Sequence, residues 1–296
     1  MQTRKLGSSG IEVSRLGIGL SEIRESDVNT VEKLLNTALD QGVNFLDTSA
    51  CYGNSEELVG KTVFNRRSEF SLATKCGHIT GGYDGIAWTA DTIKHSIDRS
   101  LSRMKTDYLD LVQLPSCDKE VLEQGEVIDE LLEAKKSGKT RFVGYSGDNE
   151  NAEWAVQSGI FDTLQTSFSL VDQKARNGLL KSAQSNGMGI IIKRPIGNGV
   201  WGKVSSSSAY TQEYFNRAKA MADLGDIIGS EDPISMAMGF LFSHEEISTA
   251  IIGTTNVNYL LSNIQMLEDG VSISPKTLSE LADRFENLGS DWYQMN

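Results

Sequence analysis

Three residues with side chains suited to proton transfer lie at the ends of short apolar runs in this sequence. Asp47 ends the run Val43–Leu46, Tyr52 follows in a polar loop, and Lys75 ends the run that begins at Phe70. An ammonium near a phenol lowers the pKa of the phenol, and a carboxylate beside the ammonium keeps it charged. Such a set suits donation of a proton to a carbonyl oxygen while a nicotinamide supplies hydride. The alternative is that Asp47 only ties down a turn and that Tyr52 only covers the core.

The segment after Tyr52 contains the signals of a helix start. Ser55 is expected to be the N-cap, and Glu56 and Glu57 then lie in the first turn, where carboxylates interact favourably with the positive end of the helix dipole. A strand, a polar loop with an aspartate and a tyrosine, and a capped helix together have the layout of a catalytic loop.

Eight apolar runs alternate with segments of helical periodicity along the chain. Strands are expected at Arg15–Leu20, Val43–Asp47, Phe70–Lys75, Tyr108–Leu114, Arg141–Ser146, Thr163–Phe168, Gly189–Arg194 and Thr249–Ile252. This alternation predicts βαβ units and a parallel sheet, and therefore the α/β class. Because there are eight such units and no GxGxxG turn follows the first strand, the sequence favours a closed (β/α)8 TIM barrel over a Rossmann sheet. We expect residues 1–296 to form a single domain.

Three segments stand outside this alternation. Apolar and polar positions alternate from Thr3 to Leu20 around Gly7–Gly10, which predicts an N-terminal β-hairpin. The amphipathic segment Ser274–Leu288 predicts an extra C-terminal helix. The longest irregular segment, Gly197–Ser208, is expected at the barrel mouth, either as a substrate lid or as a plain loop.

The charge and length of the chain limit the classes of partner. Its 296 residues carry a formal net charge of −12 and give a sequence pI of about 4.8. This charge argues against a nucleic-acid or anionic-membrane surface, which needs clustered basic residues. The sequence has neither a signal-peptide pattern nor an apolar segment near the roughly 20 residues needed to cross a bilayer. We therefore expect a cytoplasmic protein, by default a monomer, that acts on a small molecule.

The cysteines indicate a reducing compartment. Cys51, Cys76 and Cys117 form an odd set without a CxxC pair, which excludes a disulfide framework and a zinc-ribbon spacing. We predict no metal site. The alternative is a soft metal or redox site, because all three cysteines fall at the carboxyl ends of predicted strands.

Six longer segments occur in an order that identifies a family. They are LDTSACYGNSEELVG, ATK, LDLVQL, RFVGYSG, LQTSFS and IIGTTNVNYLLSN. Through them the chain resembles the aldo-keto reductases over nearly its whole length. The resemblance implies a barrel plugged at its bottom by the hairpin, and NAD(P)(H)-dependent interconversion of carbonyls and alcohols. It also implies that Tyr52 is the general acid, that Lys75 lowers the pKa of Tyr52, and that Asp47 pairs with Lys75.

The same resemblance implies a set of cofactor-binding residues. Ser146 and Gln165 would hold the nicotinamide carboxamide. The adenosine phosphate and adenine would lie against Gly253, Thr254, Thr255 and Asn263. Lys193 and Arg194 replace the tyrosine and serine often found in the family, and they are expected to contact the cofactor pyrophosphate or an acidic substrate.

One departure from the family affects catalysis. The family places a histidine directly after the segment LDLVQL, and this chain has Pro115 there, which offers no side-chain donor. Neither Ser116 nor Cys117 is an obvious substitute, and His78 is assigned to a solvated loop. We therefore expect a weakened reductase. The alternative is a non-catalytic regulatory module that binds nicotinamide nucleotides.

A second departure affects the choice of cofactor. Tyr259 occupies the position where the family commonly has an arginine, and no Lys or Arg lies between Gly253 and Asn263. A 2′-phosphate would lack charge-assisted partners in this segment. NADP(H) remains the family's usual choice, and NAD(H) is a serious alternative.

Overall fold

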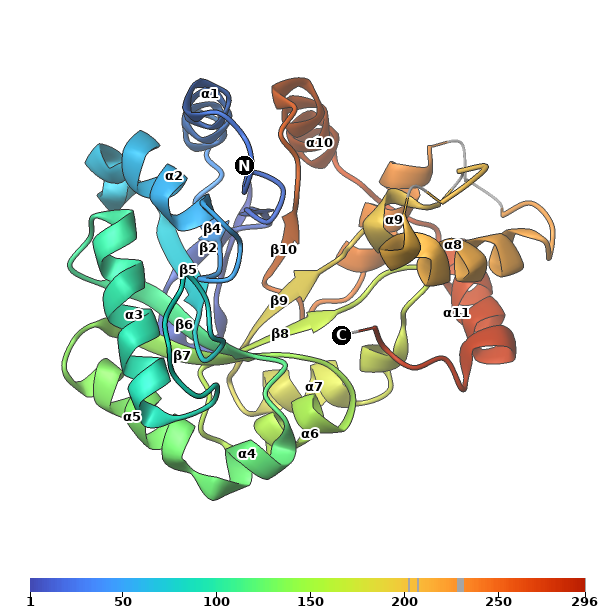
Figure 1. The fold of residues 1–296 in the computed structure, drawn as a ribbon. Coiled ribbons are helices and arrows are strands. Elements are labelled where there is room, and N and C mark those ends of the chain that lie inside the picture. Colours follow the sequence, from blue (N-terminus) through green and yellow to red (C-terminus); the bar gives the residue numbers. More distant parts are fainter. Residues whose placement is uncertain (202, 207, 228–231, 296) are drawn as a thin grey trace.

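A computed structural model describes residues 1–201, 203–206, 208–227 and 232–295 of the chain. Within these residues eight parallel strands close into a barrel in the order β10-β3-β4-β5-β6-β7-β8-β9, with β9 paired to β10 (Figure 1). The strands are β3 (Leu16–Gly19), β4 (Phe45–Asp47), β5 (Ser71–Lys75), β6 (Leu109–Pro115), β7 (Thr140–Ser146), β8 (Thr163–Ser167), β9 (Gly189–Lys193) and β10 (Thr249–Ile252). The barrel predicted from the alternation of elements is confirmed.

Helices surround the barrel on the outside (Figure 1). They are α1 (Val28–Asp40), α2 (Ser55–Thr62), α3 (Ala90–Met104), α4 (Lys119–Gln124), α5 (Glu126–Lys136), α6 (Asn149–Ser158), α7 (Leu179–Ser185), α8 (Ala209–Ala222), α9 (Pro233–Phe242), α10 (Val257–Asp269) and α11 (Pro275–Gly289). The extra C-terminal helix is confirmed as α11, whereas α4 and α8 were not expected. None of the helices traced here is long and apolar enough to span a membrane.

The N-terminal hairpin closes the amino-terminal end of the barrel. β1 (Thr3–Lys5) pairs antiparallel with β2 (Glu12–Ser14), and Ser8 N donates to Gly187 O at 2.7 Å, just before β9. Side chains of the hairpin pack against inward-facing residues of the strands in a cluster that contains Leu6, Ile11, Val13, Phe45, Ala73, Leu111, Ile191 and Ile251. The predicted plug at the bottom of the barrel is therefore present.

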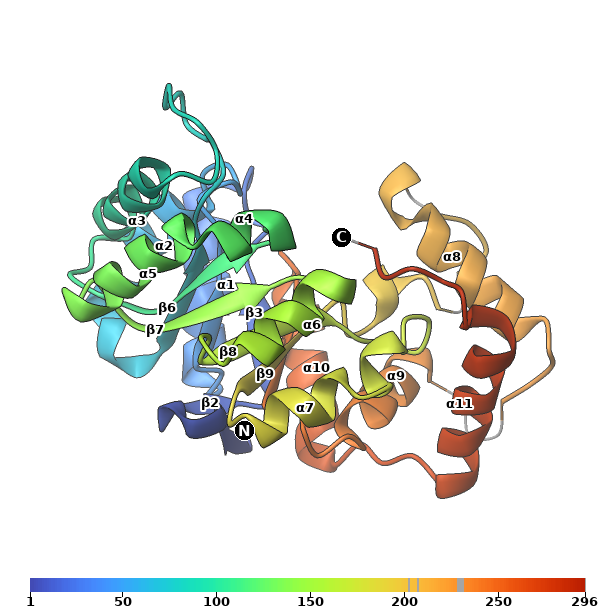
Figure 2. The same cartoon turned by 90° about the horizontal axis from the view of Figure 1, so that it is seen from below.

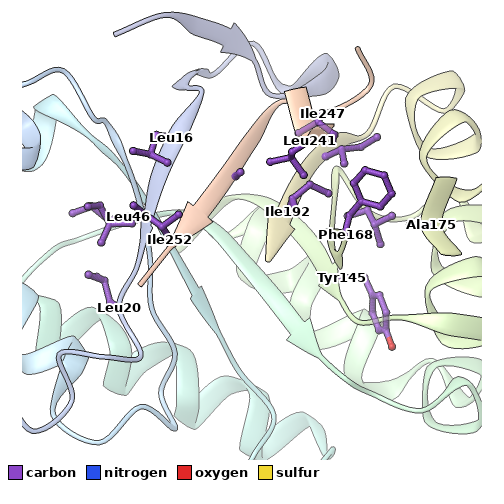
Figure 3. Packing of buried hydrophobic residues seen from close by; sticks show 14 of the residues in the cluster. Leu16, Leu20, Leu46, Tyr145, Phe168, Ala175, Ile192, Leu241, Ile247 and Ile252 are labelled. Carbon is purple, nitrogen blue, oxygen red and sulfur yellow. The ribbon is translucent and has the colours of Figure 1, made fainter. Parts of the chain in front are cut away.

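The main core lies between the strands and the surrounding helices. Figure 3 shows Leu16, Leu46 and Ile252 close together on neighbouring strands, and Leu241 and Ile247 beside β9. Each of these side chains is almost fully buried. Burial of a Leu or Ile contributes about 1.5–3 kcal/mol relative to exposure, so this layer fixes the strands that carry the polar residues at the mouth.

One local expectation needs correction, and another stays a prediction. Ser55 is the first residue of α2 and not its cap, and Asn54 precedes the helix without a side-chain cap. The predicted lid Gly197–Ser208 contains residues 202 and 207, which lie outside the described residues. Its described part begins with a short 3-10 helix, Gly197–Gly199, followed by the buried Val200.

Candidate active site

Asp47 connects four strands at the carboxyl-terminal end of the barrel. Its Oδ2 accepts a hydrogen bond from Lys75 Nζ at 2.6 Å. Its Oδ1 accepts from Gln113 Nε2 at 3.1 Å and from Gln165 Nε2 at 3.0 Å. These partners come from β5, β6 and β8, and all are buried. Asp47 is therefore the centre of a polar network, and its role is not limited to stabilising a turn.

Lys75 is a buried ammonium held between two oxygens. Besides its ion pair with Asp47, Nζ donates to Thr48 O at 2.9 Å. Burial alone lowers the pKa of Lys75, but the charges of Asp47 and Tyr52 outweigh it, so the pKa of this ammonium is raised above its ordinary value. The side chain therefore stays positive at neutral pH.

Tyr52 lies over this ammonium at the end of a tight turn. Tyr52 N donates to Ser49 O at 3.0 Å, and Thr80 Oγ1 donates to Ala50 O at 3.0 Å, which fixes the turn from both sides. Lys75 Nζ lies 5.2 Å from the centre of the Tyr52 ring. The structure thus brings together the three residues expected to transfer a proton.

The pKa of Tyr52 differs from the expected direction. The ammonium of Lys75 lowers this pKa, as the resemblance implies, and is its largest single influence. Burial and the neighbouring Asp47 and Cys51 together raise the pKa by more, so its net shift is upward. The phenol is therefore protonated at neutral pH, which is the form that a proton donor requires.

The helix behind Tyr52 is anchored by a buried carboxylate. Glu56 Oε1 accepts from Thr74 Oγ1 at 2.8 Å and from Ser100 Oγ at 2.6 Å, and burial raises its pKa. Ser55 Oγ donates to Leu20 O at 2.9 Å. The prediction that Glu56 lies in the first turn of the helix is confirmed, and its side chain bonds to residues of β5 and α3.

The two residues expected to hold a carboxamide are paired with each other. Ser146 Oγ donates to Gln165 Oε1 at 2.9 Å, and the second end of Gln165 reaches Asp47. Ser146 and Gln165 are neighbours in the register of β7 and β8. A hydroxyl and an amide side by side provide both a donor and an acceptor for an amide ligand.

Pro115 is the last residue of β6 and lies in register with Ser146 on β7. The chain then turns sharply, because Ser116 has a left-handed backbone with φ of 48°. This turn buries the Cys117 side chain in the core, and Cys117 O accepts from Tyr145 Oη at 2.8 Å. Cys117 therefore does not replace the missing donor.

The cysteines do not form a common site. Cys51 is exposed, whereas Cys76 and Cys117 are buried in the hydrophobic core. Burial raises the pKa of the Cys117 thiol to about 12 and that of Cys76 further still. No group of three or more His, Cys, Asp or Glu side chains in the described part of the chain is arranged to hold a metal ion. The alternative of a soft metal site is not supported.

Lys193 and Arg194 are held by contacts that sequence reasoning missed. Lys193 Nζ lies 2.9 Å from Asp148 Oδ2, which also accepts from Ser167 Oγ. Arg194 Nη1 donates to Ser167 Oγ at 3.0 Å and to Met295 O. Both cations therefore already have protein partners.

The C-terminal tail docks beside these cations. Figure 2 shows the chain returning from α11 toward the carboxyl ends of the strands. Gln294 is 2% exposed, and its Nε2 donates to Ser167 O at 2.9 Å. Asn149 Nδ2 donates to Gln294 O at 3.1 Å. The tail thus closes one side of the mouth above β8.

The loop after β10 carries the residues expected at the adenosine end. Asn256 N donates to Thr254 Oγ1 at 3.0 Å, and Asn258 N donates to Asn256 Oδ1 at 2.8 Å. Gly253 and Thr255 are exposed on this loop, and Asn263 is half-buried on α10. The loop is thus ordered by its own side chains at the mouth.

Gln113 belongs to the polar network around Asp47 and was not expected. Gln113 faces inward on β6 in register with Lys75, and Asp148 lies two residues after the predicted strand end at Ser146. Strand alternation could have indicated Gln113, because it lies two residues before Pro115, on the same side of the strand.

The mouth also offers polar atoms that a dinucleotide could use. Ser169 Oγ, after β8, and Asn198 Nδ2, after β9, are buried and have no partner among the residues described. A buried polar atom without a partner is costly, and a ligand that bonds to it removes that cost. Together with the hydroxyl and amide of Ser146 and Gln165, these atoms fit a nicotinamide dinucleotide.

Comparison with known proteins identifies the family of the chain. The model of the aldo/keto reductase family matches residues 15–282. The uncharacterized oxidoreductase YqkF of Bacillus subtilis is 29% identical over 288 residues, covering 90% of each chain. L-galactose dehydrogenase of Arabidopsis thaliana is 28% identical, covering 95% of this chain and 93% of that protein.

A solved structure supports the fold independently. The aldo-keto reductase AKR11C1 from Bacillus halodurans, in its holo form, superposes with a TM-score of 0.84 at 23% identity and covers 96% of both chains. The matched family model and these relatives point to the same family, and the solved structure has the same fold. This chain belongs to the aldo/keto reductase family of NAD(P)H-dependent oxidoreductases.

Proposed function

We propose that the protein reduces aldehydes or ketones to alcohols and that Tyr52 donates the proton. A nicotinamide dinucleotide, when bound, supplies the hydride. The observation that carries this proposal is the buried pair of Asp47 and Lys75, with a separation of 2.6 Å, directly under the Tyr52 ring. A carbonyl oxygen placed at the Tyr52 hydroxyl receives its proton, and Lys75 stabilises the phenolate that remains.

The remaining polar residues bind and orient. Ser146 and Gln165 would hold the carboxamide, Gly253, Thr254, Thr255 and Asn263 would contact the adenosine half, and Lys193 and Arg194 would border the ligand from β9. Asp148 keeps Lys193 in place through their 2.9 Å ion pair. A small-molecule carbonyl is the partner that this arrangement suits.

A conservative substitution tests the role of Tyr52. Tyr52→Phe removes only the hydroxyl, so turnover with a reactive aldehyde should fall by about 10²-fold to 10⁴-fold, the usual contribution of general acid catalysis. Dinucleotide affinity, measured by fluorescence, should stay within a few-fold. Tyr108→Phe is the matched control, because Tyr108 lies before β6 at the opposite end of the barrel. Turnover of Tyr52→Phe equal to that of the control would refute the assignment.

Pro115 favours a second candidate, a regulatory module that binds the nucleotide without turnover. Its ring offers no hydrogen-bond donor in the position next to Ser146. This candidate predicts tight binding of NADH or NADPH and no reduction of any aldehyde tested. Measurable turnover by the unaltered protein would eliminate it.

A further inference from the structure

One acidic side chain lies against the loop expected to receive the adenosine end of the dinucleotide. Glu22 follows β3, and its side chain lies over Gly253 so closely that a Cβ added to Gly253 would be 2.8 Å from Glu22 Cγ. Glu22 is exposed. A carboxylate is thus held beside Gly253, at the edge between β3 and β10.

The charge of Glu22 is not neutralised by a neighbour. In the described part of the chain, its only side-chain hydrogen bond comes from Ser21 Oγ at 3.4 Å, and no ion pair involves it. The nearest basic residue in the sequence, Arg24, has its Cβ beside Gly53 on the loop of Tyr52. The segment Gly253–Asn263 contains no Lys or Arg. Negative charge therefore dominates at this edge.

Two backbone N–H groups of the same loop are already bonded to side chains of the loop. Asn256 N–H is used by Thr254 Oγ1, and Asn258 N–H is used by Asn256 Oδ1. A phosphate dianion needs cations or several free N–H groups to replace its lost hydration. The loop provides hydroxyl and amide side chains instead, which suit an uncharged ribose.

We propose that Glu22 selects NAD(H) over NADP(H) by accepting hydrogen bonds from the adenosine ribose and repelling a 2′-phosphate. An acidic residue that bonds to the ribose 2′-hydroxyl is the known chemical solution for NAD in dinucleotide-binding sites. Glu22 is therefore a specificity-determining residue. This inference rests on the proposed function, because it requires that a nicotinamide dinucleotide binds at the mouth.

The test compares dissociation constants for NADH and NADPH, measured by quenching of tryptophan fluorescence. The unaltered protein should bind NADH at least about tenfold more tightly than NADPH. Glu22→Gln keeps the shape of the side chain and can still accept a hydrogen bond, but it removes the negative charge. The dissociation constant for NADPH divided by that for NADH should therefore fall by about tenfold. The preference for NADH should also weaken with added salt in the unaltered protein and vary less in Glu22→Gln.

Two further variants make the result specific. Gly253→Ala should displace the Glu22 side chain and shift the ratio in the same direction as Glu22→Gln. Glu25→Gln removes an exposed charge from the same loop and should leave the ratio unchanged. A thermal unfolding curve for each variant confirms that it is folded.

The outcomes separate this inference from the proposed function. Tighter binding of NADPH than NADH by the unaltered protein, or an unchanged ratio in Glu22→Gln, would overturn the role of Glu22 while leaving the reductase intact. Failure of the unaltered protein to bind either dinucleotide would overturn the proposed function and this inference with it.

Discussion

Asp47 and Lys75 form an ion pair in which the carboxylate side chain is 2% exposed and the lysine side chain 5% exposed. A pair this deeply buried has lost its hydration, and each charge depends on the other for compensation. The pair therefore links the stability of the barrel mouth to the positions of the residues proposed for catalysis.

Replacing one partner should destabilise the protein more than replacing both. Lys75→Met leaves the Asp47 carboxylate buried without its cation, and we expect the free energy of unfolding to fall by about 3–5 kcal/mol. The double variant Asp47→Asn, Lys75→Met removes both charges and should recover part of that loss. Unfolding in urea, followed by circular dichroism, measures both effects.

An exposed lysine provides the control for this pair. Lys61 lies on α2, is 52% exposed and pairs with Glu57 at 3.7 Å. Lys61→Met should change the free energy of unfolding by less than about 1 kcal/mol. If the double variant were as unstable as Lys75→Met alone, compensation between the two charges would not be the cause.

A second buried carboxylate makes stability depend on pH. Asp172 accepts from Tyr214 Oη at 3.4 Å, and burial, with the nearby Asp148, raises its pKa to about 7. A carboxyl whose pKa is higher in the folded than in the unfolded state stabilises the fold most at low pH. That contribution is lost as the pH rises through the folded value.

Asp172→Asn should therefore raise the unfolding temperature at pH 8 but not at pH 4. At pH 8 the free energy of unfolding should rise by the order of a few kcal/mol, because the amide avoids burial of a charge. Thermal unfolding at both pH values measures it, with Asp283→Asn, an exposed position on α11, as control. A gain of the same size at pH 4 would mean that ionisation of Asp172 is not responsible.

The C-terminal tail should detach when the buried side chain of Gln294 is shortened. Gln294→Ala removes the bond to Ser167 O, and leaving that buried carbonyl unpaired costs about 1–3 kcal/mol. We expect faster hydrogen exchange for the tail, with little change in the unfolding temperature of the barrel.

Tyr293 next to it provides the comparison. Its hydroxyl bonds to Glu150 Oε2 at 2.8 Å, but the side chain is 53% exposed. Tyr293→Phe should leave the exchange of the tail nearly unchanged, because water replaces an exposed hydrogen bond. Equal exchange in both variants would show that Gln294 does not anchor the tail.

Local sequence patterns predicted the strands well, because most strands are short runs rich in apolar residues and several end in a polar residue. The last strand, Thr249–Ile252, has the expected limits, and Asp47 and Lys75 lie at strand ends as expected. Strand ends converge in a barrel, so residues far apart in the sequence could be assigned to one site.

The same patterns did not predict α8 and α4, which have few large aliphatic residues. α8 buries Tyr214, Ala218 and Met221 at helical spacing, but a tyrosine and an alanine do not stand out as an apolar stripe. α4 has only six residues, too few for a period to be visible.

Contacts between distant segments could not be predicted from either pattern. Glu56 was expected in the first turn of a helix, but its bond to Ser100 from α3 was not. Gln294 reaches Ser167 across 127 positions of sequence. The contact of Glu22 with Gly253 joins opposite ends of the chain. Such contacts depend on how the closed barrel brings segments together, which no local period encodes.

Pro115→His should increase turnover. Pro115 ends β6 in register with Ser146, so a histidine there would project from the same strand position into the mouth. An imidazole donor near the substrate oxygen stabilises the charge that develops on it, and one such donor contributes about 10²-fold to 10³-fold. Turnover of a reactive aldehyde with NADH and NADPH, at saturating concentrations of each, measures the gain.

Comparing the change in kcat with the change in the dissociation constant of the dinucleotide identifies how Pro115→His acts. A donor that acts on the developing oxyanion raises kcat and leaves the dissociation constant of the dinucleotide unchanged. Pro115→Ala is the control for removal of the ring, because it changes the strand end without adding a donor. Equal gains in Pro115→His and Pro115→Ala would mean that the ring restricts the mouth and that no hydrogen bond is missing. No gain in either variant would mean that Tyr52 and Lys75 already stabilise the oxyanion without a third group.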